Sequence, residues 1–297
     1  METRRNLLKT LAAAPAVSLL AKRMLGTQID SKFNGVMIGA QSYSFRDRPL
    51  DAAIQGYVEV GLGYCELWQG HLEPKDRAEA KVWRTSAPES FFKDVRAKFD
   101  KAGIDLYAYN YSFRDNYTDE EIEYGFKMAQ WLGVNKITAS SNVSTAKRIS
   151  PLADKYKIYV GFHNHGNIRP NEFATPDDFA KALEGSSKYL AINLDIGHAT
   201  AAGWDPLDYL AKNHARILTL HLKDRGPNQD GKEGVNLPFG QGSTNIRGVL
   251  QLLEKNHYPI PAMIEYEYKG GDTIEEMKKC LAYCKAALFW PSKAVPG

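Results

Sequence analysis

The feature that most constrains the fold of this chain is a regular alternation between short β-rich runs and longer amphipathic stretches. From residue 35 onward we count eight such pairs. The expected strands lie at residues 36–41, 64–67, 105–109, 136–139, 158–163, 190–195, 217–222 and 262–267. The expected helices lie at residues 50–60, 90–102, 119–132, 145–156, 176–183, 206–214, 244–255 and 273–287. Because strands that alternate with helices form parallel crossovers, and eight such units close a barrel, the pattern predicts a single-domain α/β protein, a (β/α)8 TIM barrel.

Local signals at the ends of the expected helices support this architecture. Thr175-Pro176 and Asp205-Pro206 place a capping side chain before a proline at the first helical turn, and Gly103 and Gly133 stand where a helix stops and a strand starts. The alternative is an open doubly wound sheet, but no Gly-x-Gly-x-x-Gly follows the first strand. Two stretches, 70–88 and 224–242, are expected to be irregular insertions.

The N-terminal segment reads as a twin-arginine export signal. Arg4-Arg5 precedes an apolar run at residues 11–20, which is closed by Lys22-Arg23. The run is short for a bilayer core, which needs ~20 apolar residues. We therefore expect residues 1–30 to form a signal segment, residues 31–297 to form the barrel, and the protein to be periplasmic or otherwise exported. A disordered basic tail or a short amphipathic helix is the alternative, and a stable membrane association is expected only if the signal is not cleaved.

Charge narrows the range of partners. Lys and Arg number 38 and Asp and Glu number 35, which gives a formal net charge of +3. Because this excess is small and lies partly in the N-terminal segment, nucleic acid is not an expected partner. No glycine-rich loop with clustered basic residues suggests a substrate phosphate. The apolar and aromatic residues at 286–291 could pack on a second copy of the chain, so a homo-oligomer is one of the expected alternatives.

Polar side chains gather at the ends of the four last strands, where side chains of a barrel reach its functional face. Buried charge is costly inside an apolar barrel and is retained where it is paired or bound to a metal. Imidazole and carboxylate groups together suit a divalent ion, and neighbouring strands can aim them at one point. The residues concerned are His163, His165, Asp195, His198, His221, Lys223 and Glu265.

Three of these strand ends carry a family resemblance. Leu-Asp-Ile-Gly-His at 194–198, His-Leu-Lys-Asp at 221–224 and Ile-Glu-Tyr-Glu at 264–267 resemble the xylose isomerase-like barrels. The resemblance extends over residues 35–290 and includes Phe-Gly-Gln-Gly at 239–242 and Tyr-Pro-Ile at 258–260. That superfamily contains sugar isomerases, 3-epimerases, inosose dehydratases and endonuclease IV. The resemblance implies that Asp195, His221 and Glu265 are metal ligands.

The chain departs from the epimerase pattern at the fifth strand. Epimerases of this kind place a metal-binding glutamate there, whereas this chain has His163, within a His-Asn-His segment that resembles the inosose dehydratase-like branch. We expect His163 to be either a fourth metal ligand or a donor that orients a neighbouring carboxylate. Glu265 is the candidate base, and His163 or His165 the candidate acid.

Further polar and aromatic residues near strand ends are candidates for substrate binding: His198, Lys223, Glu66, Trp68, Asn110 and Trp204. For each, a structural role is the alternative. The His198 imidazole could cap a helix or lie in the core, Lys223 could pair with an acid such as Asp224, and Glu66 could pair with an arginine. Either tryptophan could belong to the core or to loop packing.

The resemblance and the strand-end residues together predict a divalent-metal-dependent sugar isomerase or epimerase. It would act on a ketose, keto-sugar or cyclitol through an enediolate. Mn²⁺ is the expected cofactor, with Co²⁺, Mg²⁺ or Zn²⁺ as alternatives, since twin-arginine export carries folded protein and allows metal loading before export. Dehydration of a keto-sugar or inosose is the alternative reaction. Two alternatives belong to other functional classes: a non-catalytic sugar-binding protein and an endonuclease IV-like phosphodiesterase. The near-neutral charge of the chain argues against the phosphodiesterase.

Overall fold

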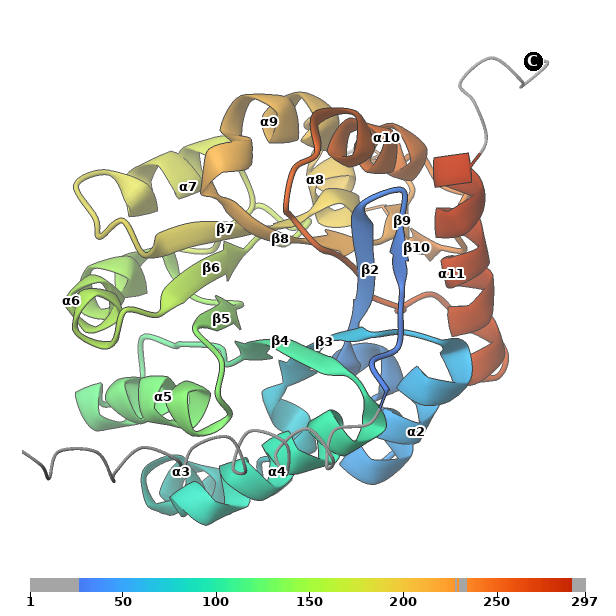
Figure 1. Cartoon of the computed structure of the whole chain (residues 1–297). Coiled ribbons are helices and arrows are strands. Elements are labelled where there is room, and N and C mark those ends of the chain that lie inside the picture. The colour runs from blue at the N-terminus through green and yellow to red at the C-terminus, as the bar shows by residue number, and fades with distance from the viewer. Residues whose placement is uncertain (1–26, 228, 230–233, 290–297) are drawn as a thin grey trace, which may run out of the picture.

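The computed structural model describes residues 27–227, 229 and 234–289. Within this part of the chain, parallel strands follow one another around a ring in the order β2-β11-β8-β7-β6-β5-β4-β3, and β2 pairs with β3 to close it (Figure 1). The strands are β2 (Val36–Gln41), β3 (Tyr64–Trp68), β4 (Asp105–Asn110), β5 (Lys136–Ala139), β6 (Tyr159–His163), β7 (Leu190–Asp195), β8 (Ile217–Leu222) and β11 (Ala262–Ile264). The predicted eight-stranded α/β barrel is confirmed.

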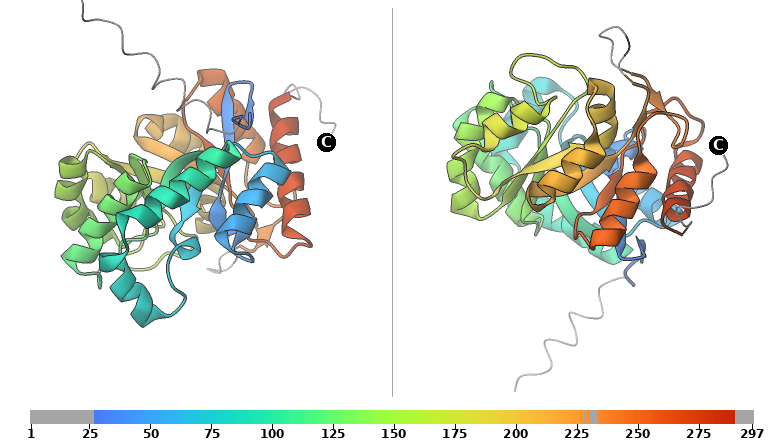
Figure 2. Two further views of the ribbon diagram at one scale, coloured as in Figure 1. Left: turned by 60° about the horizontal axis from the view of Figure 1, so that its bottom comes forward. Right: turned by 90° about the horizontal axis from the view of Figure 1, so that it is seen from above.

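Helices cover the outer face of this ring (Figures 1 and 2). They are α2 (Leu50–Val60), α4 (Glu89–Ala102), α5 (Asp119–Trp131), α6 (Ala146–Tyr156), α7 (Pro176–Leu183), α9 (Pro206–Asn213), α10 (Ile246–Asn256) and α11 (Thr273–Phe289). The caps expected at two helix ends are present. Thr175 and Asp178 form a capping box at the start of α7, and Gly103 ends α4 with a φ of 71°.

The structure differs from the sequence prediction where the chain leaves the C-terminal ends of strands. The stretch 70–88, expected to be irregular, contains α3 (Arg77–Ser86), whose first turn is capped by the Asp76 carboxylate. A short helix, α8 (Ile196–Ala202), follows β7 directly, and the stretch 224–242 contains the hairpin of β9 (Asp224–Arg225) and β10 (Asn236–Leu237). The last barrel strand ends at Ile264 rather than at residue 267.

The expected signal segment falls largely outside the described residues, which begin at residue 27. The four remaining residues, 27–30, lie against the barrel, because the Ile29 amide donates to the Gly103 carbonyl at 2.8 Å. Two short strands, β1 (Lys32–Phe33) and β2, then form an antiparallel pair. None of the helices in the described residues has the length and apolar character needed to cross a membrane.

The core lies between the ring of strands and the helices, as the β6 side chain Phe162 illustrates. Its ring is buried and stacks on Phe173 at 4.8 Å between centroids, and Phe173 contacts Phe179 of α7. Phe162→Ala is expected to lower the free energy of unfolding by about 3–5 kcal/mol, because a cavity replaces the ring. Thermal or urea unfolding checks this, with the exposed Ile168→Ala as the control. Equal unfolding midpoints for the two variants would contradict the prediction.

Candidate metal centre

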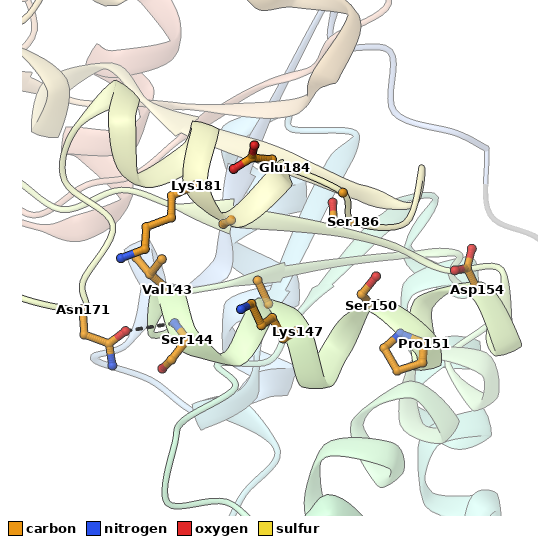
Figure 3. Close-up of a pocket in the computed structure, with 13 residues that line it drawn as sticks. Val143, Ser144, Lys147, Ser150, Pro151, Asp154, Asn171, Lys181, Glu184 and Ser186 are labelled. Carbon is orange, nitrogen blue, oxygen red and sulfur yellow. Dashed lines mark hydrogen bonds between the residues drawn. The ribbon is translucent and has the colours of Figure 1, made fainter.

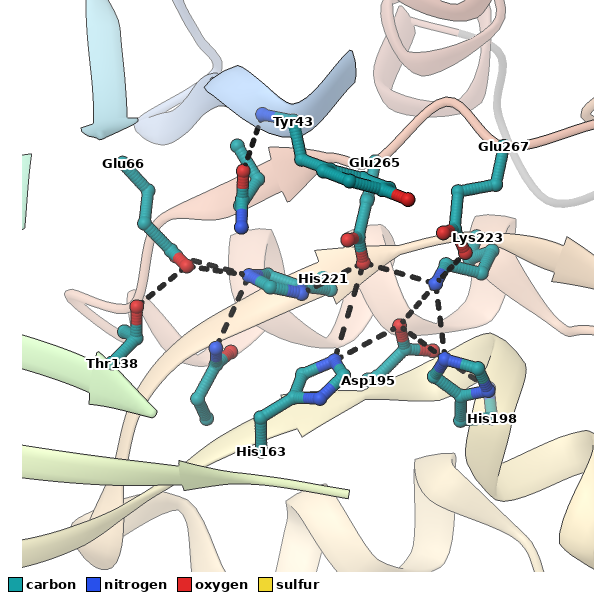
Figure 4. A network of polar contacts seen from close by, with 12 residues as sticks. Tyr43, Glu66, Thr138, His163, Asp195, His198, His221, Lys223, Glu265 and Glu267 are labelled. Atoms are coloured by element: carbon teal, nitrogen blue, oxygen red, sulfur yellow. Dashed lines mark hydrogen bonds and ion pairs between the residues drawn. The ribbon is translucent and has the colours of Figure 1, made fainter. Parts of the chain in front are cut away.

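Four side chains meet at the C-terminal ends of adjacent barrel strands. His163 ends β6, Asp195 ends β7, His221 lies in β8 and Glu265 directly follows β11. One nitrogen or oxygen atom of each lies within 4.8 Å of the others, and all four residues are buried (Figure 4). Parallel strands of a barrel end at one face, which explains how residues as far apart in the sequence as His163 and Glu265 converge.

The atoms that face one another in this cluster form no hydrogen bond that meets the usual geometry, and they lie only in close ionic contact with one another and with Lys223. His163 Nε2, Asp195 Oδ2, His221 Nδ1 and Glu265 Oε2 are each buried and unsatisfied. His221 Nδ1 lies 3.0 Å from Glu265 Oε2, and His163 Nε2 lies 3.4 Å from Asp195 Oδ2. Buried polar atoms are otherwise nearly always hydrogen-bonded, and two imidazole nitrogens with two carboxylate oxygens form a donor set that divalent transition ions accept. The four residues therefore fit a divalent metal ion.

The His221 ring is oriented by a carboxylate from the opposite side of the barrel. The oxygens Glu66 Oε1 and Oε2 lie 2.9 and 3.0 Å from His221 Nε2. Thr138 Oγ1 donates to Glu66 Oε1 at 2.6 Å, and the Asn110 amide donates to Thr138 Oγ1 at 3.1 Å. The His221 Nε2 hydrogen therefore points to Glu66, which leaves Nδ1 free to face the cluster. Glu66 and Asn110, candidates for substrate binding, both lie in this buried chain.

Glu66→Gln is expected to weaken metal binding by about 10- to 100-fold, because a neutral amide no longer polarises the ring of His221. Metal titration followed by isothermal calorimetry measures the effect. Glu89→Gln, which alters an exposed carboxylate on the helix layer, is the control. A Glu66→Gln variant with wild-type affinity would show that the carboxylate does not support the ligand.

Lys223 brings a buried positive charge to the same cluster. Its ammonium nitrogen lies 3.0 Å from Glu265 Oε2, 3.2 Å from Asp195 Oδ2 and 2.5 Å from Glu267 Oε2. Burial opposes the charge, but the three carboxylates outweigh it and raise the lysine pKa. Pairing with Asp224, the alternative raised from the sequence, does not occur, since the Asp224 carboxylate accepts from backbone amides at Gly240, Gly242 and Thr244.

His198 joins the cluster through both its backbone and its ring. Its backbone amide donates to Asp195 Oδ1 at 2.6 Å, which caps α8. Its ring lies between Arg225, whose guanidinium donates to Nδ1, and Lys223, whose nitrogen lies 3.1 Å from Nε2. Arg225 and Glu267 were not singled out as site residues from the sequence. Each lies three residues after the end of a barrel strand, β8 or β11, and only that position in the sequence could have indicated them.

Burial and charge set the protonation of the cluster. Burial would raise the pKa of Asp195, but His198 and Lys223 outweigh it and hold the carboxyl pKa well below the ordinary value. The pKa of Glu265 is likewise lowered, by Lys223 and His221 against burial. Burial lowers the pKa of His163. At neutral pH both carboxylates are therefore ionised, and His163 is neutral.

His165, the second candidate acid, lies beside the four-residue cluster. Its ring centroid is 5.1 Å from that of His163 and 5.7 Å from that of His198. Burial, followed by the positive potential of His163, His198 and Lys223, lowers its pKa to about 2. Its imidazole is thus neutral at physiological pH.

The two candidate tryptophans have different surroundings. The Trp68 ring meets the ring of Tyr43 edge to face at 4.9 Å and lines a cavity at the same face of the barrel. The Trp204 indole donates to the Ala174 carbonyl at 2.8 Å, and its ring contacts Tyr209 of α9. The contacts of Trp204 thus fix it in the packing of the helix layer.

A further cavity, of about 590 Å³, lies between α6 and α7 (Figure 3). Lys147 and Lys181 share its wall with Asp154 and Glu184, so its charges are mixed. It lies in the helix layer, away from the strand ends that carry the metal cluster.

Comparison with known proteins agrees with this geometry. Residues 55–286 match the family model of the xylose isomerase-like TIM barrel. An uncharacterized protein of Methanocaldococcus jannaschii, MJ1311, is 29% identical over 138 residues, a match that covers 45% of this chain and 45% of that protein. The aligned part thus spans less than half of that curated relative.

Solved structures share the fold at low sequence identity. The IOLI protein with a bound zinc atom is 14% identical with a TM-score of 0.66, and the match covers 86% of this chain and 99% of that one. The 3-keto-D-glucoside 4-epimerase YcjR of E. coli is 14% identical (TM-score 0.65; 84% and 99%). The probable 3-DHS dehydratase AsbF of Bacillus anthracis is 18% identical (TM-score 0.63; 84% and 98%). With the family model matched over most of the barrel, the chain belongs to the xylose isomerase-like TIM barrel family.

Proposed function

We propose that this protein is a divalent-metal-dependent enzyme that isomerises or epimerises a ketose, keto-sugar or cyclitol. The observation that carries the proposal is the convergence, within 4.8 Å, of one buried nitrogen or oxygen atom from each of His163, Asp195, His221 and Glu265. A bound divalent ion supplies Lewis-acid polarisation of a substrate carbonyl, which lowers the cost of removing a proton from the adjacent carbon. The reported functions of the structural neighbours, an epimerase and a dehydratase, accord with this chemistry.

The residues of the cluster have different roles in the proposed proton transfer. Glu265, ionised at neutral pH, is the base that accepts the carbon-bound proton. Lys223 stays protonated and stabilises the negative charge that develops on a substrate oxygen. His163 and His165 were candidate acids, but burial lowers the pKa of both, so neither is an imidazolium at neutral pH. We therefore assign them to ligand binding and to shaping the cavity.

The chemical types of the four ligand side chains indicate which metal ion the site would prefer. Two imidazoles accompany two carboxylates, and imidazole favours transition ions over Mg²⁺. We propose Mn²⁺ as the cofactor, with Co²⁺ and Zn²⁺ as the nearest alternatives. The zinc atom named in the IOLI structure agrees with a transition ion at such a site.

Proton NMR in deuterium oxide tests the proposed function. Purified protein loaded with Mn²⁺ is incubated with ketoses, 3-keto-glycosides and inososes, with the chelator-treated protein in parallel; the paramagnetic ion is removed before spectra are recorded. Deuterium uptake at a carbon next to the carbonyl, lost on chelation and restored by metal, is the expected result. Stoichiometric metal without uptake into any of these sugars would contradict the proposal and favour sugar binding or phosphodiester hydrolysis.

A dehydratase is the second candidate function. His163 replaces the glutamate expected of epimerases at the end of β6, and the structural neighbour AsbF is named as a probable dehydratase. The same spectra distinguish the reactions, because dehydration yields a product with an unsaturated carbon and epimerisation does not.

We also propose that the chain is exported through its Arg4-Arg5 signal. Replacing both arginines by lysine is expected to leave the protein in the cytoplasmic fraction, because the twin-arginine pair is the recognised part of such signals. Immunoblots of periplasmic and cytoplasmic fractions check this. Equal periplasmic amounts of the wild type and the variant would contradict it.

A further inference from the structure

A cavity of about 760 Å³ opens at the same face of the barrel as the metal cluster, between the loops that follow β2, β3 and β4. Its wall includes Trp68, whose ring contacts Tyr43. The turn that carries Tyr43 is bound to the segment around Glu265, because Ser44 Oγ donates to the Ile264 carbonyl and accepts from the Tyr266 amide. Figure 4 shows Tyr43 on the side of the cluster formed by Glu265. The wall of the cavity is therefore connected, through Trp68 and Tyr43, to the segment that carries Glu265.

The two carboxylates on the wall of this cavity are already neutralised. Asp47 forms a two-point pair with Arg48, with distances of 2.9 and 2.8 Å. Glu73 forms a similar pair with Arg84, at 3.0 and 2.7 Å. Arginine and carboxylate matched in this way leave little negative charge for a ligand to meet.

Three further cations line the cavity: Arg46, Lys75 and Arg114. Arg46 donates to the carbonyls of Tyr43 and Tyr266, which are neutral groups, so its charge is not cancelled. Among the residues that the structure describes, neither Lys75 nor Arg114 forms an ion pair with an acidic side chain. Arg114 is partly buried. The cavity thus carries a net positive charge.

The wall of the cavity is held in place by its own contacts. The Trp68 ring is fixed between Tyr43 and His71, with centroid distances of 4.9 and 5.5 Å. His71 Nε2 in turn lies within hydrogen-bond distance, 3.0 Å, of the Ser42 carbonyl. A preformed aromatic wall beside unpaired cations is suited to a sugar ring that carries a negative group.

We propose that this cavity binds an oxyanion, a carboxylate or a phosphate, on the far end of the sugar whose reacting carbons lie at the metal centre. The inference rests on the proposed function and narrows its substrate class to acidic sugars. Guanidinium groups recognise both oxyanions through paired hydrogen bonds, and a nearby ammonium adds charge. The sequence shows no local phosphate motif because Arg46, Lys75 and Arg114 come from three separate loops that only the barrel brings together.

Calorimetric titration of the Mn²⁺-loaded protein tests this subsite, with D-glucuronate, inorganic phosphate and neutral methyl β-D-glucoside as probes. Arg114→Gln and Lys75→Gln are each expected to weaken binding of the charged probe by about tenfold, because each removes a charge-assisted contact. Arg77→Gln is the matched control, since Arg77 is an exposed arginine two residues from Lys75 that does not line the cavity. Tighter binding of glucuronate than of phosphate assigns the carboxylate, and the reverse order assigns the phosphate.

Two results would overturn the subsite: equal binding of the neutral glucoside and the charged probes, or equal weakening by Arg77→Gln. Lys75 is exposed, so Lys75→Gln keeps the test valid if Arg114→Gln fails to fold. Failure of the subsite is distinct from failure of the proposed function. Metal-dependent exchange in neutral sugars without binding of either anion refutes the subsite alone, whereas binding that depends on Arg114 without any exchange refutes the enzyme function alone.

Discussion

Asp195→Asn is expected to slow metal-dependent proton exchange strongly while the barrel stays folded. The two oxygens of this carboxylate have separate tasks. Oδ1 accepts the His198 amide at 2.6 Å and caps α8, whereas Oδ2 faces His163 and Lys223 at 3.4 and 3.2 Å. Asparagine is an equally good cap but supplies no negative charge to a metal ion. We expect the exchange rate to fall by about a thousandfold, since the loss of Lewis-acid polarisation removes several kcal/mol of transition-state stabilisation.

The chain offers a matched control for this variant. Asp205 caps α9 in the same way, by accepting the Leu207 amide at 2.8 Å, but it is exposed and lies outside the cluster. Asp205→Asn is therefore expected to keep wild-type metal content and exchange. Metal analysis after dialysis measures the metal content, and the NMR assay measures the exchange rate. Thermal unfolding shows whether the barrel stays folded. An Asp195→Asn protein that retains stoichiometric metal would refute the assignment of this residue as a ligand.

The fold could be predicted from the sequence because its signals are local. Strands β5, β7 and β8 and helices α2 and α7 have the bounds expected from hydrophobic patterning and from caps such as Thr175-Pro176. The errors lie in the segments after β3, β7 and β8, where α3, α8 and the β9–β10 hairpin formed, and at the end of β11, which stops at Ile264. These segments lie outside the eight strand-and-helix units, so the repeating pattern that defines the barrel does not extend to them.

The site was only partly predictable, for a physical reason. Residues at strand ends converge through the geometry of any barrel, so His163, Asp195, His221 and Glu265 could be expected at one point, and the structure brings them together. The partner of a buried polar group depends on contacts across the barrel. Glu66 was expected to bind a sugar hydroxyl or an arginine, yet its carboxylate meets His221, 155 residues away. No local pattern encodes that contact.

Metal affinity is expected to rise with pH through the neutral range, and the reason lies in His221. Burial opposes its charged form, but the carboxylates of Glu66 and Glu265 outweigh burial and raise its pKa well above the ordinary value. In the metal-free protein His221 therefore carries a proton on both ring nitrogens at neutral pH. A metal ion must displace the Nδ1 proton, while Glu66 retains the one on Nε2. A group that is protonated when free and deprotonated when bound makes affinity increase with pH until the pKa of the free state is passed.

The other three ligands release no proton near neutral pH. The number of protons released per metal ion is therefore expected to be set by His221 alone. The lowered pKa of His163 leaves its imidazole neutral, and Asp195 and Glu265 are already ionised. Calorimetry at pH 7 in buffers of different ionisation enthalpy should thus report one proton released per metal ion bound. Glu66→Gln removes one of the two carboxylates that raise the pKa of His221, so it should reduce both the proton release and the slope of affinity against pH. An affinity that does not change between pH 6 and pH 8, with no dependence of the heat on the buffer, would show that His221 is not protonated in the metal-free protein.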